Sequence, residues 1–270
     1  MRSRRRPCRA FTSAALPASL LKHSGCRCIV PAVTLALPFD YGATYVVRVN
    51  LDALRDRFVA GERLVYWSTA VSAYDGYRGW FFRQIGSRVV RSWDVEGAAE
   101  SARAGEWFER AGDPDPAIAS ARAGDAEGLE VELRSRPIDV LAMELAFGAA
   151  VEAGVSNAAV YELLVRNSGF DATCQLALLH AAASNGVVTA LEPLHASGIA
   201  IDQADDSGHT ALLHATYAEH VDAARWLVAR GADPARTTAQ GNSPRSFAAL
   251  RKNADLIDLF DAVPRRASAD

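Results

Sequence analysis

Cysteine, methionine and long apolar runs are scarce in this sequence. Among 270 residues, four are cysteine and two are methionine. Cys8, Cys26 and Cys28 lie near the N-terminus and Cys174 lies far downstream, which is not the pattern of a disulfide framework. Cys26 and Cys28 lack the second ligand pair of a zinc site, so reduced thiols in a cytoplasmic protein are favoured. The apolar stretch 29–37 is too short and too rich in proline to cross a bilayer, so no membrane span is predicted.

Motifs of common enzyme classes are also missing. The sequence has no glycine-rich phosphate loop, no zinc-protease motif and no nucleophile elbow. Five of the six histidines lie in the C-terminal half, and in the sequence no set of carboxylates or cysteines completes a site around them. We therefore expect no catalytic residue, metal ligand or cofactor, and we assign these histidines to scaffold or surface: His180, His195, His209, His214 and His220.

Acidic side chains are absent from residues 1–39, which carry seven basic ones. Because the whole chain has a net charge of −3, the remainder carries −10, which argues against nucleic acid or an anionic membrane as the partner. Residues 1–39 share a basic, serine-rich composition with targeting peptides but complete no targeting pattern. The abrupt change of composition at Phe39 favours a disordered extension or a start codon assigned too far upstream.

Residues 40–112 are predicted to form a small β-rich domain. Strand-like runs cover 45–49, 63–74, 77–85 and 88–95, and Asp75-Gly76 is a strong hairpin signal between two of them. Short helices are expected at 51–60, ended by Gly61, and at 98–111. The simplest architecture is a β-meander with one or two helices, and the cluster of glycine, aspartate and proline at 112–116 marks a boundary.

The β-rich domain is unusual for its many aromatic side chains. By strand alternation about half of them must face inward, so we expect them to fill a small core. The alternative is that exposed rings stack on sugars or bases, which would make 40–112 a ligand-binding or catalytic domain. The aromatic residues concerned are Tyr66, Trp67, Tyr74, Tyr77, Trp80, Phe81, Phe82 and Trp93.

A repeated unit organises the second half of the chain. In residues 208–233, apolar positions 223, 224, 226 and 227 form one helical stripe that includes Trp226, and Gly231 follows where a helix would end. Such a unit buries its stripe only against copies of itself, so Trp226 is expected in the core between repeats. A shift of 33 residues carries Leu212 to Leu179 and Gly231 to Gly198, and the same shift forward carries Gly208 to Gly241.

The 33-residue period and the recurring leucine and glycine positions resemble the ankyrin repeat. The resemblance covers residues 115–264, and residues 265–270 are expected to form a tail. The resemblance implies an α+β chain: a mostly α solenoid of about five helix-pair repeats behind the β-meander. Pro193 interrupts one expected second helix, which would either begin late, near Leu191, or be kinked. Leu213 stands at the position of the family's histidine, and polar Arg245 and Ser246 suit a terminal repeat.

By this resemblance the protein is expected to be a non-enzymatic module that binds another protein through hairpin tips and inner helices. The alanine- and arginine-heavy composition suits a bacterial source, in which a toxin-neutralising immunity factor is one such role. The candidate contacts are the variable positions at the hairpins and on the first helices: Ser184, Asn185, Asp205, Asp206, His209, Tyr217, Glu219, Arg236 and Gln240.

Overall fold

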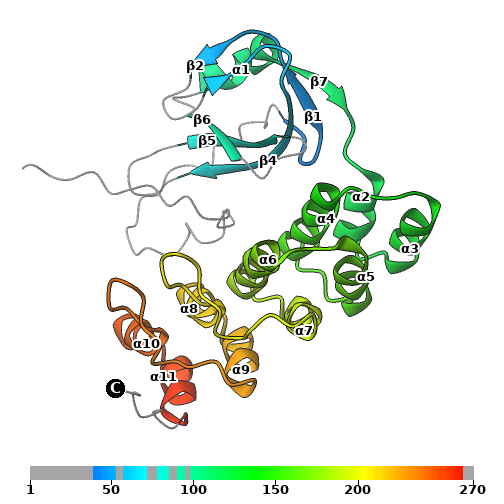
Figure 1. Ribbon diagram of the computed structural model, residues 1–270. Coiled ribbons are helices and arrows are strands. Elements are labelled where there is room, and N and C mark those ends of the chain that lie inside the picture. The colour runs from blue at the N-terminus through cyan, green and yellow to red at the C-terminus, as the bar shows by residue number, and fades with distance from the viewer. Residues whose placement is uncertain (1–38, 53–56, 72–77, 85–89, 95–97, 264–270) are drawn as a thin grey trace, which may run out of the picture.

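The computed structural model describes residues 39–52, 57–71, 78–84, 90–94 and 98–263 (Figure 1). The expectations for the N-terminal extension up to residue 38, the Asp75-Gly76 turn and the 265–270 tail lie outside these residues. Within them, no helix is long and apolar enough to cross a membrane.

The N-terminal part is an antiparallel sheet of five strands in the order β6-β5-β4-β1-β7, with a separate two-stranded pair. Strands β4, β5 and β6 pair in chain order as the predicted meander, with Tyr66 opposite Phe82. The strands are β1 (Thr44–Val47), β2 (Leu51–Asp52), β3 (Arg57–Phe58), β4 (Arg63–Val71), β5 (Arg78–Gln84), β6 (Val90–Asp94) and β7 (Phe108–Gly112).

Two expectations for this region are wrong. The described residues of the expected helix at 51–60 form instead the short antiparallel pair β2–β3, in which Leu51 lies opposite Phe58. The second expected helix, 98–111, ends at Trp107, where α1 (Ala98–Trp107) gives way to strand β7. In both places strand pairing outweighs weak local helix propensity: β2 pairs with its neighbour β3, and β7 pairs with the distant strand β1.

Aromatic side chains close the interior of the sheet region, as expected for Tyr66 and Phe82. Phe82 is fully buried and stacks on Phe108 with ring centroids 4.9 Å apart, and Phe39 meets it edge-on at 5.1 Å. Edge-to-face and offset pairs of this kind add stability beyond the area they bury. The side chains of Trp67, Trp80, Phe81 and Trp93, and all of Tyr74 and Tyr77, lie outside the described part.

Five helix pairs follow in a curved row that runs from α2 beside the sheet to α11 at the far end (Figure 1). First helices pack on first helices and second helices on second helices, which gives an inner layer (α2, α4, α6, α8, α10) and an outer layer (α3, α5, α7, α9, α11). The helices are α2 (Pro116–Ala123), α3 (Ala126–Ser135), α4 (Val140–Glu152), α5 (Ala158–Ser168), α6 (Ala172–Asn185), α7 (Val188–Ala196), α8 (Ala211–Tyr217), α9 (Val221–Ala229), α10 (Pro244–Arg251) and α11 (Ala254–Asp261).

Glycine ends two of the first helices. Gly124 and Gly186 cap α2 and α6 with φ of 74° and 70°, and their N–H groups bond to the last carbonyls of the helix. This left-handed geometry is strained for a residue with a side chain, which explains why glycine recurs there. Each of these caps turns the chain directly into the second helix of its pair.

Pro193 lies inside α7 and does not delay its start. The helix begins at Val188, three residues before the expected late start at Leu191, and Pro193 itself is buried. Proline cannot donate to the carbonyl of Thr189, so this helix lacks one of its internal hydrogen bonds.

Trp226 lies at the edge of the core and not in its centre. The side chain is partly buried, meets the edge of His195 with ring centroids 6.0 Å apart, and carries the Arg230 guanidinium 3.7 Å above its ring. The next residue, Leu227, is fully buried. The repeat period therefore located the stripe correctly but placed Trp226 too deep.

We expect Trp226→Ala to lower the free energy of unfolding by about 0.5–3 kcal/mol, as for an ordinary partly buried residue. Leu227→Ala should cost more, about 2–5 kcal/mol, although leucine is smaller, because its whole side chain leaves a cavity. Urea unfolding of both variants, followed by circular dichroism, tests this order. A larger loss for Trp226→Ala would contradict the edge position.

Candidate functional site

The loop that leads into α8 is held in shape by Asp205. One carboxylate oxygen accepts hydrogen bonds from the backbone N–H groups of Ser207 and His209, both at 2.9 Å, and the other lies 3.3 Å from His209 Nδ1. Thr210 closes the hairpin opposite Ala204, and its hydroxyl caps α8 by accepting from the Leu213 N–H. Short polar side chains commonly fix turns in this way. Asp205 therefore has a structural role in the loop.

The loop that leads into α10 is tied to the first one. The N–H of Ala239 donates to the carbonyl of Ser207 at 3.4 Å, and the two loops project on the same side of the row (Figure 1). Gly208, with φ of 82°, permits the contact, because a Cβ there would lie 3.1 Å from the Thr238 Cα. At the base, the Asp202 carboxylate accepts from the Asp233 N–H at 3.0 Å. The loops form one surface with a fixed spacing.

Three of the nine predicted contact residues are exposed at these loops: Asp206, Arg236 and Gln240. Five are only partly exposed: Asn185, Asp205, His209, Tyr217 and Glu219. The ring of Tyr217 packs 4.0 Å from that of Phe247, and Glu219 lies 3.8 Å from Arg251 in the next unit. Asn185 donates to the carbonyl of Ala181 at 2.9 Å.

Ser184 does not reach the surface. It is fully buried where α6 packs on α8, and its hydroxyl lies 3.3 Å from His214 Nδ1. A side chain in this position cannot touch a partner while the repeats stay folded. Ser184 therefore belongs to the interior and leaves the predicted contact set.

Two buried histidines and a carboxylate meet beneath the first loop. His180 from α6, His214 from α8 and Asp205 from the loop each offer one ligand atom, and these atoms all lie within 4.8 Å of one another. The imidazole rings of His180 and His214 are 4.6 Å apart. Among the residues that the structure describes, neither His180 Nε2 nor His214 Nε2 has a hydrogen-bond partner. A buried polar atom without a partner is rare and calls for an explanation.

Burial lowers the pKa of both imidazoles. The pKa of His180 falls to about 4, although Asp205 and the nearby backbone of Gln203 partly oppose the effect. Burial, with His180 and His209 close by, also moves the pKa of His214 well below its ordinary value. Both rings are therefore neutral at pH 7, and a neutral imidazole has a lone pair that can accept a hydrogen bond or bind an ion.

Sequence reasoning assigned His180 and His214 to scaffold or surface and did not bring them together with Asp205. The two histidines are 34 residues apart, one more than the repeat period, so they occupy adjacent positions on neighbouring inner helices. Asp205 lies in the loop that joins the two units, close in space to both. The spacing of about one repeat is the signal in the sequence that relates the two histidines.

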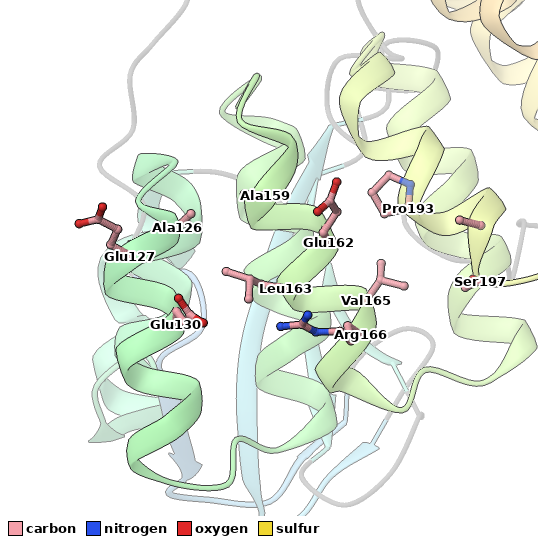
Figure 2. A pocket seen from close by; sticks show the side chains of 11 residues that line it. Ala126, Glu127, Glu130, Ala159, Glu162, Leu163, Val165, Arg166, Pro193 and Ser197 are labelled. Atoms are coloured by element: carbon pink, nitrogen blue, oxygen red, sulfur yellow. The ribbon is translucent and has the colours of Figure 1, made fainter.

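The outer layer carries a second feature, a shallow groove of about 570 Å³ between α3, α5 and α7. Figure 2 shows Leu163 between α3 and α5, with Glu162 and Arg166 along α5 and Pro193 on α7. Its lining mixes charged and small apolar side chains without a convergent set of polar groups. Because Glu162 and Arg166 are exposed and carry opposite charges, this groove supplies a control surface for substitutions in the loops.

Comparison with known proteins identifies the central repeats. The model of the ankyrin-repeat family matches residues 147–238 with three copies, which span the second half of α4 to the loop before α10. No curated protein matches the chain. The remaining helices, before and after this match, continue the same two-layer stacking. The protein is therefore a mostly helical α+β protein in which residues 147–238 are ankyrin repeats.

Proposed function

We propose that this protein is a non-enzymatic interaction module that binds another protein through its two loops and the adjoining inner helices. Ankyrin repeats generally serve in protein–protein interaction. The observation that carries the proposal is the linked pair of loops, whose exposed side chains are Asp206, Arg236 and Gln240. Repeat proteins use extended concave surfaces of this kind for binding.

The rigidity of the loops supports a binding role. Ordering a loop on binding costs free energy, so a surface that is already fixed retains more of its contact energy as affinity. The bond from Ala239 to Ser207 and the close approach at Gly208 fix the spacing between the two loops before any partner arrives. Asp206 and Arg236 then present opposite charges on one prepared surface.

The partly exposed residues contribute at the rim of the proposed surface. Tyr217 and Glu219 lie at the end of α8, and both already contact the following unit. Asp205 and His209 contribute by shaping the loop. The acidic balance of the chain favours a protein partner over a nucleic acid.

The alternative, a ligand-binding or catalytic domain at 40–112, has less support. The described aromatic residues Tyr66 and Phe82 are buried in the core of the sheet region, where they are unavailable for stacking on a ligand. We further propose a reducing cytoplasm, in keeping with the small number of cysteines and their lack of a disulfide framework, and a bacterial source.

A pair of charge-matched variants tests the proposed surface. Asp206→Ala with Arg236→Ala removes one charge of each sign from the loops, and Glu162→Ala with Arg166→Ala does the same on the outer groove. All four side chains are exposed, so each substitution should change the stability by no more than about 0.5 kcal/mol. The loop variant should lose proteins that the wild type captures from native lysate, because a few contacts dominate an interface.

The outer variant serves as the control and should retain those proteins. If the folded loop variant captures everything that the wild type does while the outer variant fails, the loops are not the binding surface. A matching melting temperature for all three proteins is required before the capture results are compared.

A further inference from the structure

We propose that His180, His214 and Asp205 form a binding site for a divalent transition-metal ion of the zinc class. The inference goes beyond protein binding and does not depend on it. Two imidazole nitrogens and a carboxylate oxygen are a common ligand set of zinc, and a fourth position is then left for water or another donor. Calcium and magnesium prefer sites built of oxygen alone, so the two histidines select against them.

The positions of the three side chains carry the proposal. The ligand atoms come from α6, α8 and the loop between the two units, and they lie within 4.8 Å of one another. Zinc bonds of about 2.0–2.2 Å would bring donors to about 3.4 Å apart, so the widest separation contracts by at most about 1.4 Å. In this proposal the shift comes from rotation about side-chain bonds, with the helices in place.

The orphaned nitrogens are the second, independent observation. His180 Nε2 and His214 Nε2 are buried, and no partner for either occurs in the part of the chain that the structure describes. Both residues are more than nine-tenths buried, at 8% and 7% exposure. An unsatisfied buried nitrogen is costly, and an ion bound by both would satisfy two such atoms at once.

Neighbouring groups form hydrogen bonds with the proposed ligands, as the groups around the ligands of known metal sites do. His214 Nδ1 meets the Ser184 hydroxyl at 3.3 Å; if that nitrogen donates, Nε2 keeps its lone pair. Asp205 is fixed by two backbone N–H groups, with His209 beside it. Hydrogen bonds to the second nitrogen of a ligating histidine, and to a ligating carboxylate, orient both in known sites.

A bound ion would join the third and fourth helix pairs. His180 belongs to the third pair and His214 to the fourth, while Asp205 shapes the loop that carries Asp206. Binding would thus stiffen the junction and raise the melting temperature of the folded chain, since an ion that binds only the folded state stabilises it.

The test is titration of the full chain with Zn²⁺ after removal of metal by a chelator. We expect one zinc per chain by calorimetry, a rise in melting temperature, and with Co²⁺ the visible absorption of a nitrogen- and oxygen-ligated ion. Asp205→Asn keeps an oxygen for the two loop N–H groups but removes a charged ligand, and should weaken zinc binding by at least about tenfold. His180→Gln and His214→Gln should each do the same.

Two controls separate this site from other zinc-binding groups. His195→Gln removes a histidine outside the cluster, whose Nδ1 lies 3.3 Å from the carbonyl of Ile199, and should leave zinc affinity unchanged. Cys26→Ser with Cys28→Ser should also leave it unchanged. Absence of zinc binding by the wild type, equal binding by Asp205→Asn, or loss of binding in the cysteine variant would each overturn the proposal.

Ser184→Ala tests the contact between the Ser184 hydroxyl and His214 Nδ1. It should weaken zinc binding by about 10–100-fold while the stoichiometry and the cobalt spectrum stay the same, because Ser184 positions His214 and does not touch the ion. Zinc affinity that is unchanged in this variant would show that the Ser184 hydroxyl does not orient the ligand.

Discussion

Replacing Phe147 by alanine is expected to lower the free energy of unfolding by about 3–5 kcal/mol. Phe147 lies on α4 and is fully buried, with its ring 5.1 Å from that of Tyr161 and 6.5 Å from that of Phe170. It therefore fills the space between α4, α5 and the loop that leads into α6, and truncation leaves a cavity that rigid helix pairs cannot close. Urea unfolding followed by circular dichroism measures the loss.

Hydrogen exchange should show where this damage falls. Because each pair contacts only its neighbours, protection should drop first in α4, α5 and α6 and less in α10 and α11. Val131→Ala on the exposed face of α3 is the control and should change the stability by no more than about 0.5 kcal/mol. A loss below about 1 kcal/mol for Phe147→Ala would contradict its central place in the core.

The second large effect concerns the ion pair between the sheet and the repeats. Arg83 on β5 donates two hydrogen bonds to the Glu144 carboxylate on α4, at 2.9 and 2.8 Å, and the side chains are only 11% and 15% exposed. Removing one partner of a buried ion pair takes from the other charge the counter-ion that it meets at hydrogen-bond distance. We expect Glu144→Ala to cost about 3–5 kcal/mol.

A double-mutant cycle isolates this interaction. Arg83→Met and Glu144→Met are measured singly and together, and the double variant should cost less than Glu144→Met alone, because neither charge of the pair remains. Glu130→Ala breaks an exposed pair with Arg134 and should cost no more than about 1 kcal/mol. Equal losses for Glu144→Ala and Glu130→Ala would mean that the Arg83–Glu144 pair is solvated.

The helical part could be predicted because its signals are local and repeated. Glycine at 124 and 186 ends a helix by its own backbone freedom, and a 33-residue shift relates Leu179 to Leu212 at matching buried positions. A pattern that recurs reports the packing of each copy on the next, so the helix pairs followed from the sequence. The depth at which a residue of the helical stripe is buried did not follow from the sequence, as Trp226 illustrates.

The features that the sequence missed depend on contacts between distant residues. Strand β7 forms because Phe108 and its neighbours pair with β1, about 60 residues earlier in the chain, and local propensity carries no sign of that partner. Ser184 is polar and close to a helix end, which favours exposure, yet α8 covers it. The histidine cluster combines residues from two helices and a loop, so only the folded chain shows it.

Docking of the sheet on the first helices limits how the row of repeats can grow. The Tyr41 hydroxyl donates to the carbonyl of Leu145, a Cβ on Gly42 would lie 2.7 Å from Ile118, and Val65 belongs to the same core as α2. The apolar end of the solenoid, which a free repeat array must shield with a polar capping unit, is here covered by a β-sheet. No further repeat can stack in front of α2 while the sheet stays in place. The array between the sheet and the loops can therefore become longer only if a repeat within it is duplicated.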